Sequence, residues 1–412
     1  MIPPSAAPQA PHHGFHVLAK PAGAICNLDC SYCFYLTKEE LYPGSKFRMS
    51  EEVLRAYLGQ AIASEPGPTV TVAWQGGEPT LLGVDFYRRA AEIVADLLPA
   101  GKTVEWTMQT NGTRLDEEWC ELFAEHGYLV GLSLDGPRPL HDAYRLDKRG
   151  RGTFDRVVEA ARLLDRRGVD FNLLCCVSAA NADRGLEVYR FFRDGIGARY
   201  MQFIPVVERI DEHGATGHRQ SGDRVTDRTV SGEQWGGFLI EVFDEWVSRD
   251  VGEVFVVSFD WALAAWLGME SPVCLFRERC GAALALEHNG DLYSCDHFVE
   301  PGHLLGNILS APLSELAASD RQRRFGEQKE AGLPGYCRRC EVRFACNGEC
   351  PKNRFLSTPD GEPGLNYLCA GYRAFFNHVD RPMRVMADLL RSGRPAVEAM
   401  GILAEPGTRT AR

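Results

Sequence analysis

Cysteine spacing constrains this chain more than any other feature of its sequence. Three cysteines lie together near the amino end as Cys26-x3-Cys30-x2-Cys33, and a second group lies between residues 274 and 369. Clustered thiols in a reducing compartment usually bind metal, whereas those of a small secreted chain form disulfides. Residues 1–14 contain neither the basic segment nor the apolar segment of a secretory signal. We therefore expect a cytoplasmic protein with metal centres.

Composition excludes several other classes of protein. Of the 412 residues, 45% are hydrophobic and 25% are charged, which is typical of a globular protein and not of a disordered one. The net charge of −11 disfavours nucleic acid as a partner. No apolar run approaches the roughly 18 residues that cross a bilayer, so we expect no membrane association.

Strand-like and helix-like segments alternate over residues 15–204. The expected strands cover residues 15–20, 69–74, 103–110, 128–134, 171–178 and 198–204, and the expected helices cover 50–64, 84–98, 115–126, 153–167 and 182–194. Such alternation predicts parallel strands joined by right-handed crossovers. Six units are too few for a closed eight-stranded barrel, so the prediction is an α/β fold with a partial (β/α)6 barrel. Its chemistry is expected at the carboxyl ends of the strands.

The length of the chain indicates more than one domain. Aromatic residues recur at helical spacing after residue 232 and indicate helices that pack in a core. We expect a disordered lead (1–14), the barrel (15–231) with a polar insertion (208–231), a helical connector (232–273), a loop-rich cysteine domain (274–378), and a helix with a tail (379–412).

The first cysteine group directly follows the first expected strand. Three thiolates can bind three irons of a 4Fe–4S cluster and leave the fourth iron open to a small molecule. A structural zinc site would need a fourth ligand, and His12, His13 and His16 do not have a zinc-binding spacing. The position and the count together favour an open iron–sulfur cluster.

This C-x3-C-x-aromatic-C loop after strand one resembles that of the radical S-adenosylmethionine (SAM) superfamily. The stretches GGEP after the second strand and LSLDG at the fourth strand resemble other parts of the same family. The resemblance implies that SAM binds to the cluster held by Cys26, Cys30 and Cys33. The residues implied to contact SAM are Tyr32 near the adenine, Gly76, Gly77 and Glu78 near the amino group, Ser133 and Arg145 near the carboxylate and ribose, and Val206 through its backbone near the adenine.

Eight further cysteines lie in the carboxyl-terminal region. Eight thiolates satisfy either two 4Fe–4S clusters or two zinc sites, and the count does not choose between them. Their order resembles the SPASM domain of radical SAM enzymes that modify peptides, which carries two auxiliary 4Fe–4S clusters. This resemblance implies one set of Cys274, Cys280, Cys295 and Cys350 and another of Cys337, Cys340, Cys346 and Cys369. The remaining cysteines, Cys120, Cys175 and Cys176, are expected to be small buried hydrophobic residues.

Longer stretches resemble the anaerobic sulfatase-maturating enzymes, namely CNLDCSYCFY, WQGGEPTLLG, QTNGT, SLDGP, NGDLYSCDHFV and LGNI. The resemblance implies oxidation of a sulfatase Cys or Ser to Cα-formylglycine by a 5′-deoxyadenosyl radical. The implied partners are an unfolded or nascent sulfatase segment with a C/S-x-P/A-x-R site and an electron donor of the flavodoxin or ferredoxin type.

Four residues are expected to act on the substrate. Asp296 directly follows Cys295, and the resemblance makes it the proton acceptor. Tyr35, Gln75 and Gln109 lie at or near strand ends and are expected to face the peptide.

Two other functions remain open from the sequence. A different SPASM maturase would form a crosslink or thioether in a short precursor peptide. The other is a zinc-binding module without radical chemistry, which its iron content would separate from either enzyme.

Overall fold

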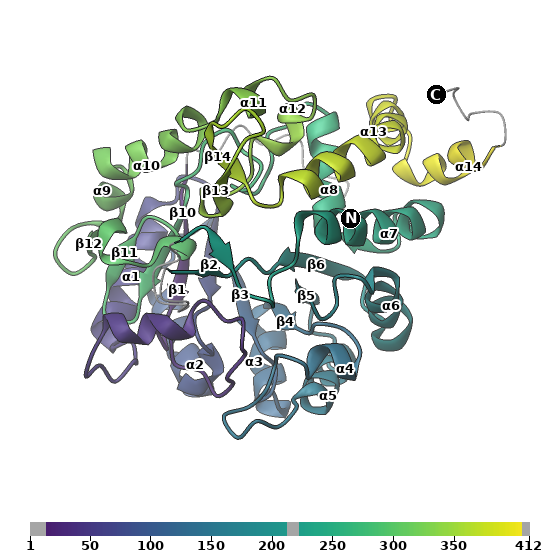
Figure 1. Cartoon of the computed structure of the whole chain (residues 1–412). Helices are drawn as coiled ribbons and strands as arrows, with labels where there is room; N and C mark the ends of the chain where they lie inside the picture. The colour runs from purple at the N-terminus through teal and green to yellow at the C-terminus, as the bar shows by residue number, and fades with distance from the viewer. Residues whose placement is uncertain (1–13, 212–221, 406–412) are drawn as a thin grey trace.

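The structure, a computed structural model, describes residues 14–211 and 222–405. All six strands expected from the sequence form: β1 (His16–Lys20), β2 (Thr69–Trp74), β3 (Thr103–Thr110), β4 (Leu129–Ser133), β5 (Phe171–Val177) and β6 (Tyr200–Pro205). They pair in parallel and in chain order. The prediction of a parallel β/α sheet is confirmed (Figure 1). The lead expected over 1–14 lies, except for its last residue, outside the described residues.

The sheet is longer than the sequence predicted. It has ten strands in the order β12-β11-β10-β1-β2-β3-β4-β5-β6-β9. The additional strands are β9 (Phe255–Val256), β10 (Ala283–Glu287), β11 (Asp291–Tyr293) and β12 (Leu304–Asn307). Strand β10 pairs in parallel with β1, and β11 and β12 continue from it as antiparallel strands. Part of the region predicted to be loop-rich therefore extends the barrel sheet.

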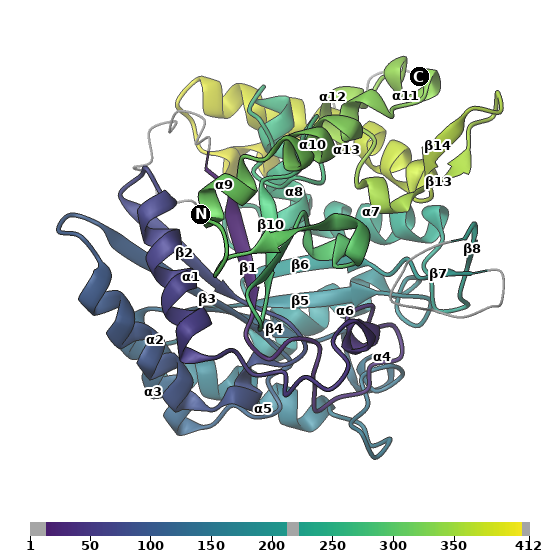
Figure 2. The same cartoon turned by 90° about the vertical axis from the view of Figure 1, so that its left-hand side faces the viewer.

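Helices pack on the outer side of the sheet and bury apolar residues against it. They are α1 (Glu51–Ser64), α2 (Val84–Leu97), α3 (Glu117–His126), α4 (Arg138–His141), α5 (Phe154–Arg166) and α6 (Gly185–Arg190). Figure 2 shows α1, α2, α3 and α5 along one side of the strands. Polar side chains define where they begin, because Ser50 accepts a hydrogen bond from the Val53 amide and Asp116 from the Trp119 amide. The helix expected over 182–194 ends early and continues as a π-helical turn over Phe191–Ile196.

The remaining helices belong to the second half of the chain. They are α7 (Gly232–Arg249), α8 (Val257–Trp266), α9 (Leu313–Ala317), α10 (Asp320–Ala331), α11 (Gly335–Arg338), α12 (Arg343–Cys346), α13 (Cys369–Arg391) and α14 (Ala399–Ala404). The last long helix begins at Cys369, ten residues before the expected start at residue 379. Its early start allows α13 to pack along α7, where a Cβ on Gly371 would lie 2.1 Å from the Gly232 carbonyl oxygen.

The aromatic residues of α7 pack in the core, as predicted. Trp235, Phe238, Phe243 and Trp246 are buried. Two short hairpins stand apart from the main sheet: β7 (Arg209–Ile210) with β8 (Arg224–Val225), and β13 (Arg354–Ser357) with β14 (Pro363–Asn366). Within the described residues, no helix combines the length and the apolar character needed to cross a membrane.

Candidate active site

The first cysteine loop lies at the carboxyl end of β1, where the sheet brings several strand ends together. The GGEP turn after β2 holds the start of this loop, because the Gly77 amide donates to the Gly23 carbonyl (2.8 Å) and the Glu78 amide donates to the Ile25 carbonyl (2.9 Å). Two donors also approach the Cys26 sulfur, the Leu28 amide at 3.3 Å and the Asn111 side chain at 3.6 Å. Such donors stabilise a thiolate.

Burial keeps the thiols of this loop protonated in the absence of metal. Burial, together with the charge of Glu78, raises the pKa of Cys26 to about 11. Burial also raises the pKa of Cys30 and Cys33, and the charge of the Cys33 thiolate adds to the rise in both Cys26 and Cys30. The three sulfurs are therefore neighbours, and metal binding would have to displace their protons.

Two glycines allow the GGEP turn to lie directly against this loop. A Cβ on Gly77 would lie 2.1 Å from the Ile25 carbonyl oxygen, which no side chain could tolerate. Gly76 has a φ of 130°, a conformation that favours glycine. The turn therefore requires both glycines for its packing, in addition to any contact with a ligand.

Glu78 is fully buried beneath the turn. Its carboxylate accepts hydrogen bonds from the Thr80 amide and hydroxyl (3.0 and 2.6 Å), the Thr110 hydroxyl (2.8 Å) and the Asn111 amide (2.8 Å). These bonds tie the end of β2 to the end of β3. The expected contact between Glu78 and the SAM amino group stays a prediction beside this structural role.

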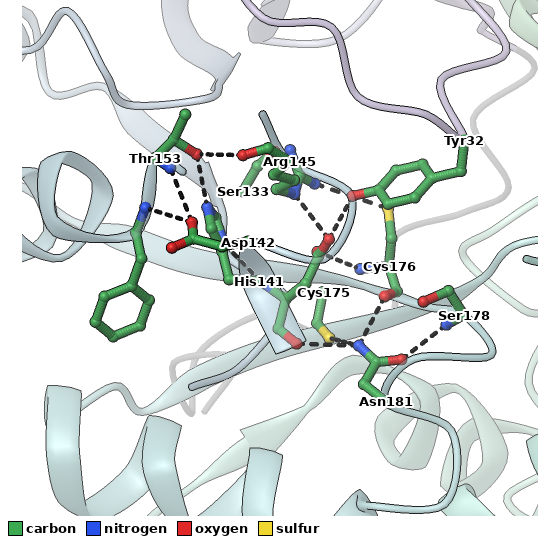
Figure 3. A network of polar contacts seen from close by, with 12 residues as sticks. Tyr32, Ser133, His141, Asp142, Arg145, Thr153, Cys175, Cys176, Ser178 and Asn181 are labelled. Carbon is green, nitrogen blue, oxygen red and sulfur yellow. Dashed lines mark hydrogen bonds and ion pairs between the residues drawn. The ribbon is translucent and has the colours of Figure 1, made fainter. Parts of the chain in front are cut away.

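A buried aspartate, Asp135, organises the residues expected to bind SAM near the end of β4. Figure 3 labels Tyr32, Ser133 and Arg145 in this network of polar contacts. Asp135 accepts hydrogen bonds at Oδ2 from the Tyr32 hydroxyl and from Arg145 Nε (2.9 Å), and at Oδ1 from the Cys176 amide (2.9 Å). The Arg145 guanidinium also lies 5.6 Å from the centre of the Tyr32 ring. Arg145 is therefore not a surface arginine, since it is 7% exposed and ion-paired.

A second layer of hydrogen bonds fixes Asp135 and Arg145. The Asp135 amide donates to His141 Nδ1 (3.3 Å), and His141 Nε2 bonds to the Thr153 hydroxyl (2.9 Å), which in turn donates to the Arg145 carbonyl (2.9 Å). Asn181 donates to the carbonyl oxygens of Asp135 and Cys176, both at 3.0 Å. Burial lowers the pKa of His141 to about 4, so its ring is neutral.

The other predicted contacts of SAM lie nearby. Gln109 at the end of β3 donates to the Ser133 hydroxyl at the end of β4 (3.0 Å). The Val206 amide donates to the Val177 carbonyl (2.8 Å), and its carbonyl accepts from Val230 (3.1 Å). The backbone of Val206 is thus already paired within the protein, and its contact with adenine stays a prediction.

The predicted base and two predicted substrate contacts meet around one lysine. The Lys20 ammonium forms an ion pair with Asp296, donates to Gln75 Oε1 (3.0 Å) and lies 4.4 Å from the centre of the Tyr35 ring. The Tyr35 hydroxyl donates to Glu287. Burial raises the pKa of Asp296, but the charges of Lys20 and Lys352 and the neighbouring His297 outweigh it, so that the pKa is lowered and the side chain is a carboxylate.

Members of each expected set of carboxyl-terminal cysteines lie near one another, and their division between two clusters stays a prediction. Burial is the main cause that raises the pKa of Cys280, Cys295 and Cys350, and in each case the Cys274 thiol adds to the rise. The other set lines one cavity with about 410 Å³ of empty space: Cys337, Cys340, Cys346 and Cys369. Four thiols that line one space suit a polynuclear cluster. Within residues 14–211 and 222–405, no three His, Cys, Asp or Glu side chains are close enough to share one metal ion.

Sequence reasoning missed several residues of this site. Asp135 lies within the quoted SLDGP stretch, and a polar residue directly after a strand was the available signal. Lys20 ends the first strand, where a charged residue breaks an apolar run. Cys176, expected to be a buried hydrophobic residue, is half-buried and accepts from Arg145 (3.8 Å). The expectation of a small buried side chain holds for Cys120 and Cys175.

Comparisons with known proteins agree with this geometry. The chain matches the Radical SAM superfamily over residues 21–191 and the SPASM iron–sulfur cluster-binding domain over residues 274–341. It is 46% identical to the serine-type anaerobic sulfatase-maturating enzyme of Bacteroides thetaiotaomicron, over 92% of this chain and 93% of that protein. It is 31% identical to the cysteine-type enzyme of Clostridium novyi, over 87% of this chain and 94% of that protein.

A solved structure shares the architecture. Native anSMEcpe with bound AdoMet and Cp18Cys peptide superposes with a TM-score of 0.80 at 30% sequence identity. The match covers 91% of this chain and 99% of that one. The radical SAM fold with a carboxyl-terminal SPASM domain, expected from the sequence, is confirmed.

Proposed function

The chain belongs to the anaerobic sulfatase-maturating enzymes, radical SAM oxidoreductases with a SPASM iron–sulfur domain, and we propose that its own site residues carry out formylglycine formation as follows. The observation that carries the proposal is the convergence of Asp296, Gln75 and Tyr35 around Lys20, beside the thiol loop after β1. These residues are separated by up to 276 positions in the sequence, Lys20 to Asp296, yet they form one buried polar group.

The donor sets fit three iron–sulfur clusters. Cys26, Cys30 and Cys33 would hold the cluster that binds SAM, and the two sets of four carboxyl-terminal cysteines would hold auxiliary 4Fe–4S clusters. When bound, these groups supply a 5′-deoxyadenosyl radical that removes a hydrogen atom from the substrate Cβ, and an acceptor for the second electron. The chain's remaining residues orient SAM and the peptide and accept the proton.

SAM would be oriented by the network around Asp135. Arg145 is held through Nε by Asp135 and through Nη2 by the Cys176 sulfur, which leaves Nη1 to face a carboxylate. Ser133 is placed by Gln109, and the Gly76–Gly77 backbone passes close to the cysteine loop. Tyr32 is fixed by its hydroxyl, so its ring can present a face to the adenine.

The substrate side chain would lie between Asp296 and the strand ends. After Cβ has lost its hydrogen atom, the substrate must lose one further proton and one electron to become an aldehyde or thioaldehyde. An Asp296 carboxylate oxygen accepts this proton. Gln75, Gln109 and Tyr35 contact the peptide around it.

Serine is a target of this chain, and cysteine is the second one to test. The serine-type relative is 46% identical, whereas the cysteine-type relative is 31% identical. Oxidation of serine removes two hydrogen atoms and yields formylglycine directly, whereas cysteine yields a thioaldehyde that water converts. The sulfatase segment would carry S-x-A-x-R or C-x-P-x-R, and the electron donor would be of the flavodoxin or ferredoxin class.

Turnover of synthetic peptides tests this function. The enzyme is reconstituted with iron and sulfide without oxygen, reduced, and given SAM with a serine or a cysteine peptide. We expect roughly 12 irons per chain, four for each of three clusters. We also expect 5′-deoxyadenosine together with an aldehyde-bearing peptide. Formation of 5′-deoxyadenosine without peptide oxidation, or a crosslinked product, would contradict the proposal.

A further inference from the structure

Lys20 is a buried cation that the roles described so far leave unexplained. It is the last residue of β1, and its residue exposure is only 2%. We propose that Lys20 is a positioning residue, which holds the Asp296 carboxylate and the Gln75 amide in the orientation that peptide oxidation requires. This inference rests on the proposed function, in which Asp296 accepts the substrate proton.

Strand register places these groups together. In the β1–β10 pair Lys20 lies opposite Glu287, and in the β1–β2 pair Ala19 lies opposite Trp74, which brings Gln75 beside Lys20. Neighbours in parallel register project to the same face of a sheet. Strand β1 lies between β10 and β2 (Figure 1). Lys20 is therefore flanked by β10, which carries Glu287, the partner of Tyr35, and by β2, which leads to Gln75.

The amine fixes which end of the Gln75 amide faces the substrate. Lys20 can only donate, and it donates to Gln75 Oε1. The Gln75 Nε2 group is then directed elsewhere as a donor, which suits a hydroxyl or carbonyl oxygen of a bound peptide. Without Lys20 the amide could rotate and present either end.

The same amine fixes the predicted base. Its ion pair with Asp296 and its position over the Tyr35 ring restrict the carboxylate to one side of the site. Lys352 and His297 also act on Asp296. His297 approaches the Cys350 sulfur at 3.6 Å, and Lys352 lies 5.1 Å from the Phe34 ring. Lys20 alone among these three contacts both Asp296 and Gln75.

The test compares two products of the full-length holoenzyme, 5′-deoxyadenosine and the formylglycine peptide. Lys20→Met removes the charge and keeps the length of the side chain. We expect formylglycine formation to fall about 10²-fold, as for a misplaced catalytic group. 5′-Deoxyadenosine formation should fall much less, so the ratio of 5′-deoxyadenosine to formylglycine rises. The reduced enzyme should still give the EPR signal of a SAM-bound cluster, because Lys20 bonds to Gln75 and Asp296 and acts on the Cys33 thiol only through its charge.

A double variant separates positioning from general damage. If Lys20 acts through Asp296, the variant Lys20→Met/Asp296→Asn should be hardly slower than Asp296→Asn alone. Lys102→Met is the matched control. The Lys102 amine bonds to the Ile62 and Glu65 carbonyls at the amino end of β3, whereas Lys20 lies at the carboxyl end of β1. Its product ratio should equal that of the wild type.

Each result decides the inference. A wild-type product ratio in Lys20→Met, or fully additive losses in the double variant, would overturn the positioning role alone. If Lys20→Met does not fold, Lys20→Gln is read in the same way, with a raised ratio in support and a wild-type ratio against. A wild-type enzyme that oxidises neither peptide would overturn the proposed function instead.

Discussion

Two buried polar networks lie at the carboxyl ends of the parallel strands, and their central residues carry opposite charges. At the end of β1 a cation, Lys20, gathers acceptors. At the end of β4 an anion, Asp135, gathers donors. The first network is suited to fixing a carboxylate and an amide for the peptide, and the second is suited to fixing an arginine and a tyrosine for SAM.

The networks also differ in which regions of the sequence supply their residues. All groups around Asp135 come from residues 32–181, within the barrel (Figure 3). The Lys20 network requires Asp296 and, through Tyr35, Glu287. It is complete only when β10 has paired with β1. The contacts around Asp135 therefore come from the barrel alone, whereas those around Lys20 include residues of the carboxyl-terminal region.

Asp296→Asn should have the largest effect on the first network. The amide cannot accept the substrate proton, so we expect formylglycine formation to fall by about 10²- to 10⁴-fold. Iron content and SAM binding should be preserved, because neither needs this carboxylate. Mass spectrometry of the peptide and chromatography of 5′-deoxyadenosine measure the two steps separately. Full activity of this variant would remove Asp296 from its role.

Asp135→Asn tests the second network, again by replacing a carboxylate with an amide. The substitution leaves the Arg145 charge without its buried partner, which costs about 3–5 kcal/mol in the free energy of unfolding. We also expect weaker SAM binding with an unchanged ratio of 5′-deoxyadenosine to formylglycine, opposite to the Lys20 variants. Denaturant titration and equilibrium binding of SAM measure the two effects.

The matched control is Asp155→Asn, which breaks the exposed ion pair with Arg138. It should change neither stability nor SAM binding appreciably. A raised product ratio in Asp135→Asn would contradict the division of labour between the networks.

His141 should give the Asp135 network a dependence on pH. Burial lowers the pKa of His141 from 6.5 to about 4, so between these values the unfolded chain binds more protons than the folded one. The free energy of unfolding therefore falls as the pH falls through this window, by roughly 3 kcal/mol in all from this residue. Urea titrations at several pH values give the free energy of unfolding as a function of pH. In His141→Gln this free energy should fall less steeply as the pH falls. An unchanged slope would show that the ring is not held neutral.

Ser133→Ala should have the smallest effect. It removes the hydrogen bond from Gln109 (3.0 Å) but no charge. We expect a loss of about 1 kcal/mol in the free energy of unfolding and less than about a tenfold rise in the Kd for SAM. A larger rise than in Asp135→Asn would mean that Ser133, and not the Asp135–Arg145 pair, dominates SAM binding.

Local signals predicted much of the molecule. β-Branched runs between turns predicted β2 and β3 with the bounds they have, and the helical spacing of apolar residues predicted α1 to within one residue of its start. Strands β10 to β12 are only three to five residues long and follow cysteine-rich turns, so no periodic pattern predicted them. Asp135 and Lys20 escaped notice because their role depends on partners distant in the chain.

The sequence by itself determined the donor atoms and the scaffold. The thiols at fixed spacings, the glycines of the GGEP turn and the alternating strands and helices follow from local chemistry. The tertiary structure decided which groups meet, because the pairing of β10 with β1 is a long-range hydrogen-bond register that no local pattern encodes. That register carries Asp296 to Lys20 and thereby joins the carboxyl-terminal region to the first strand of the barrel.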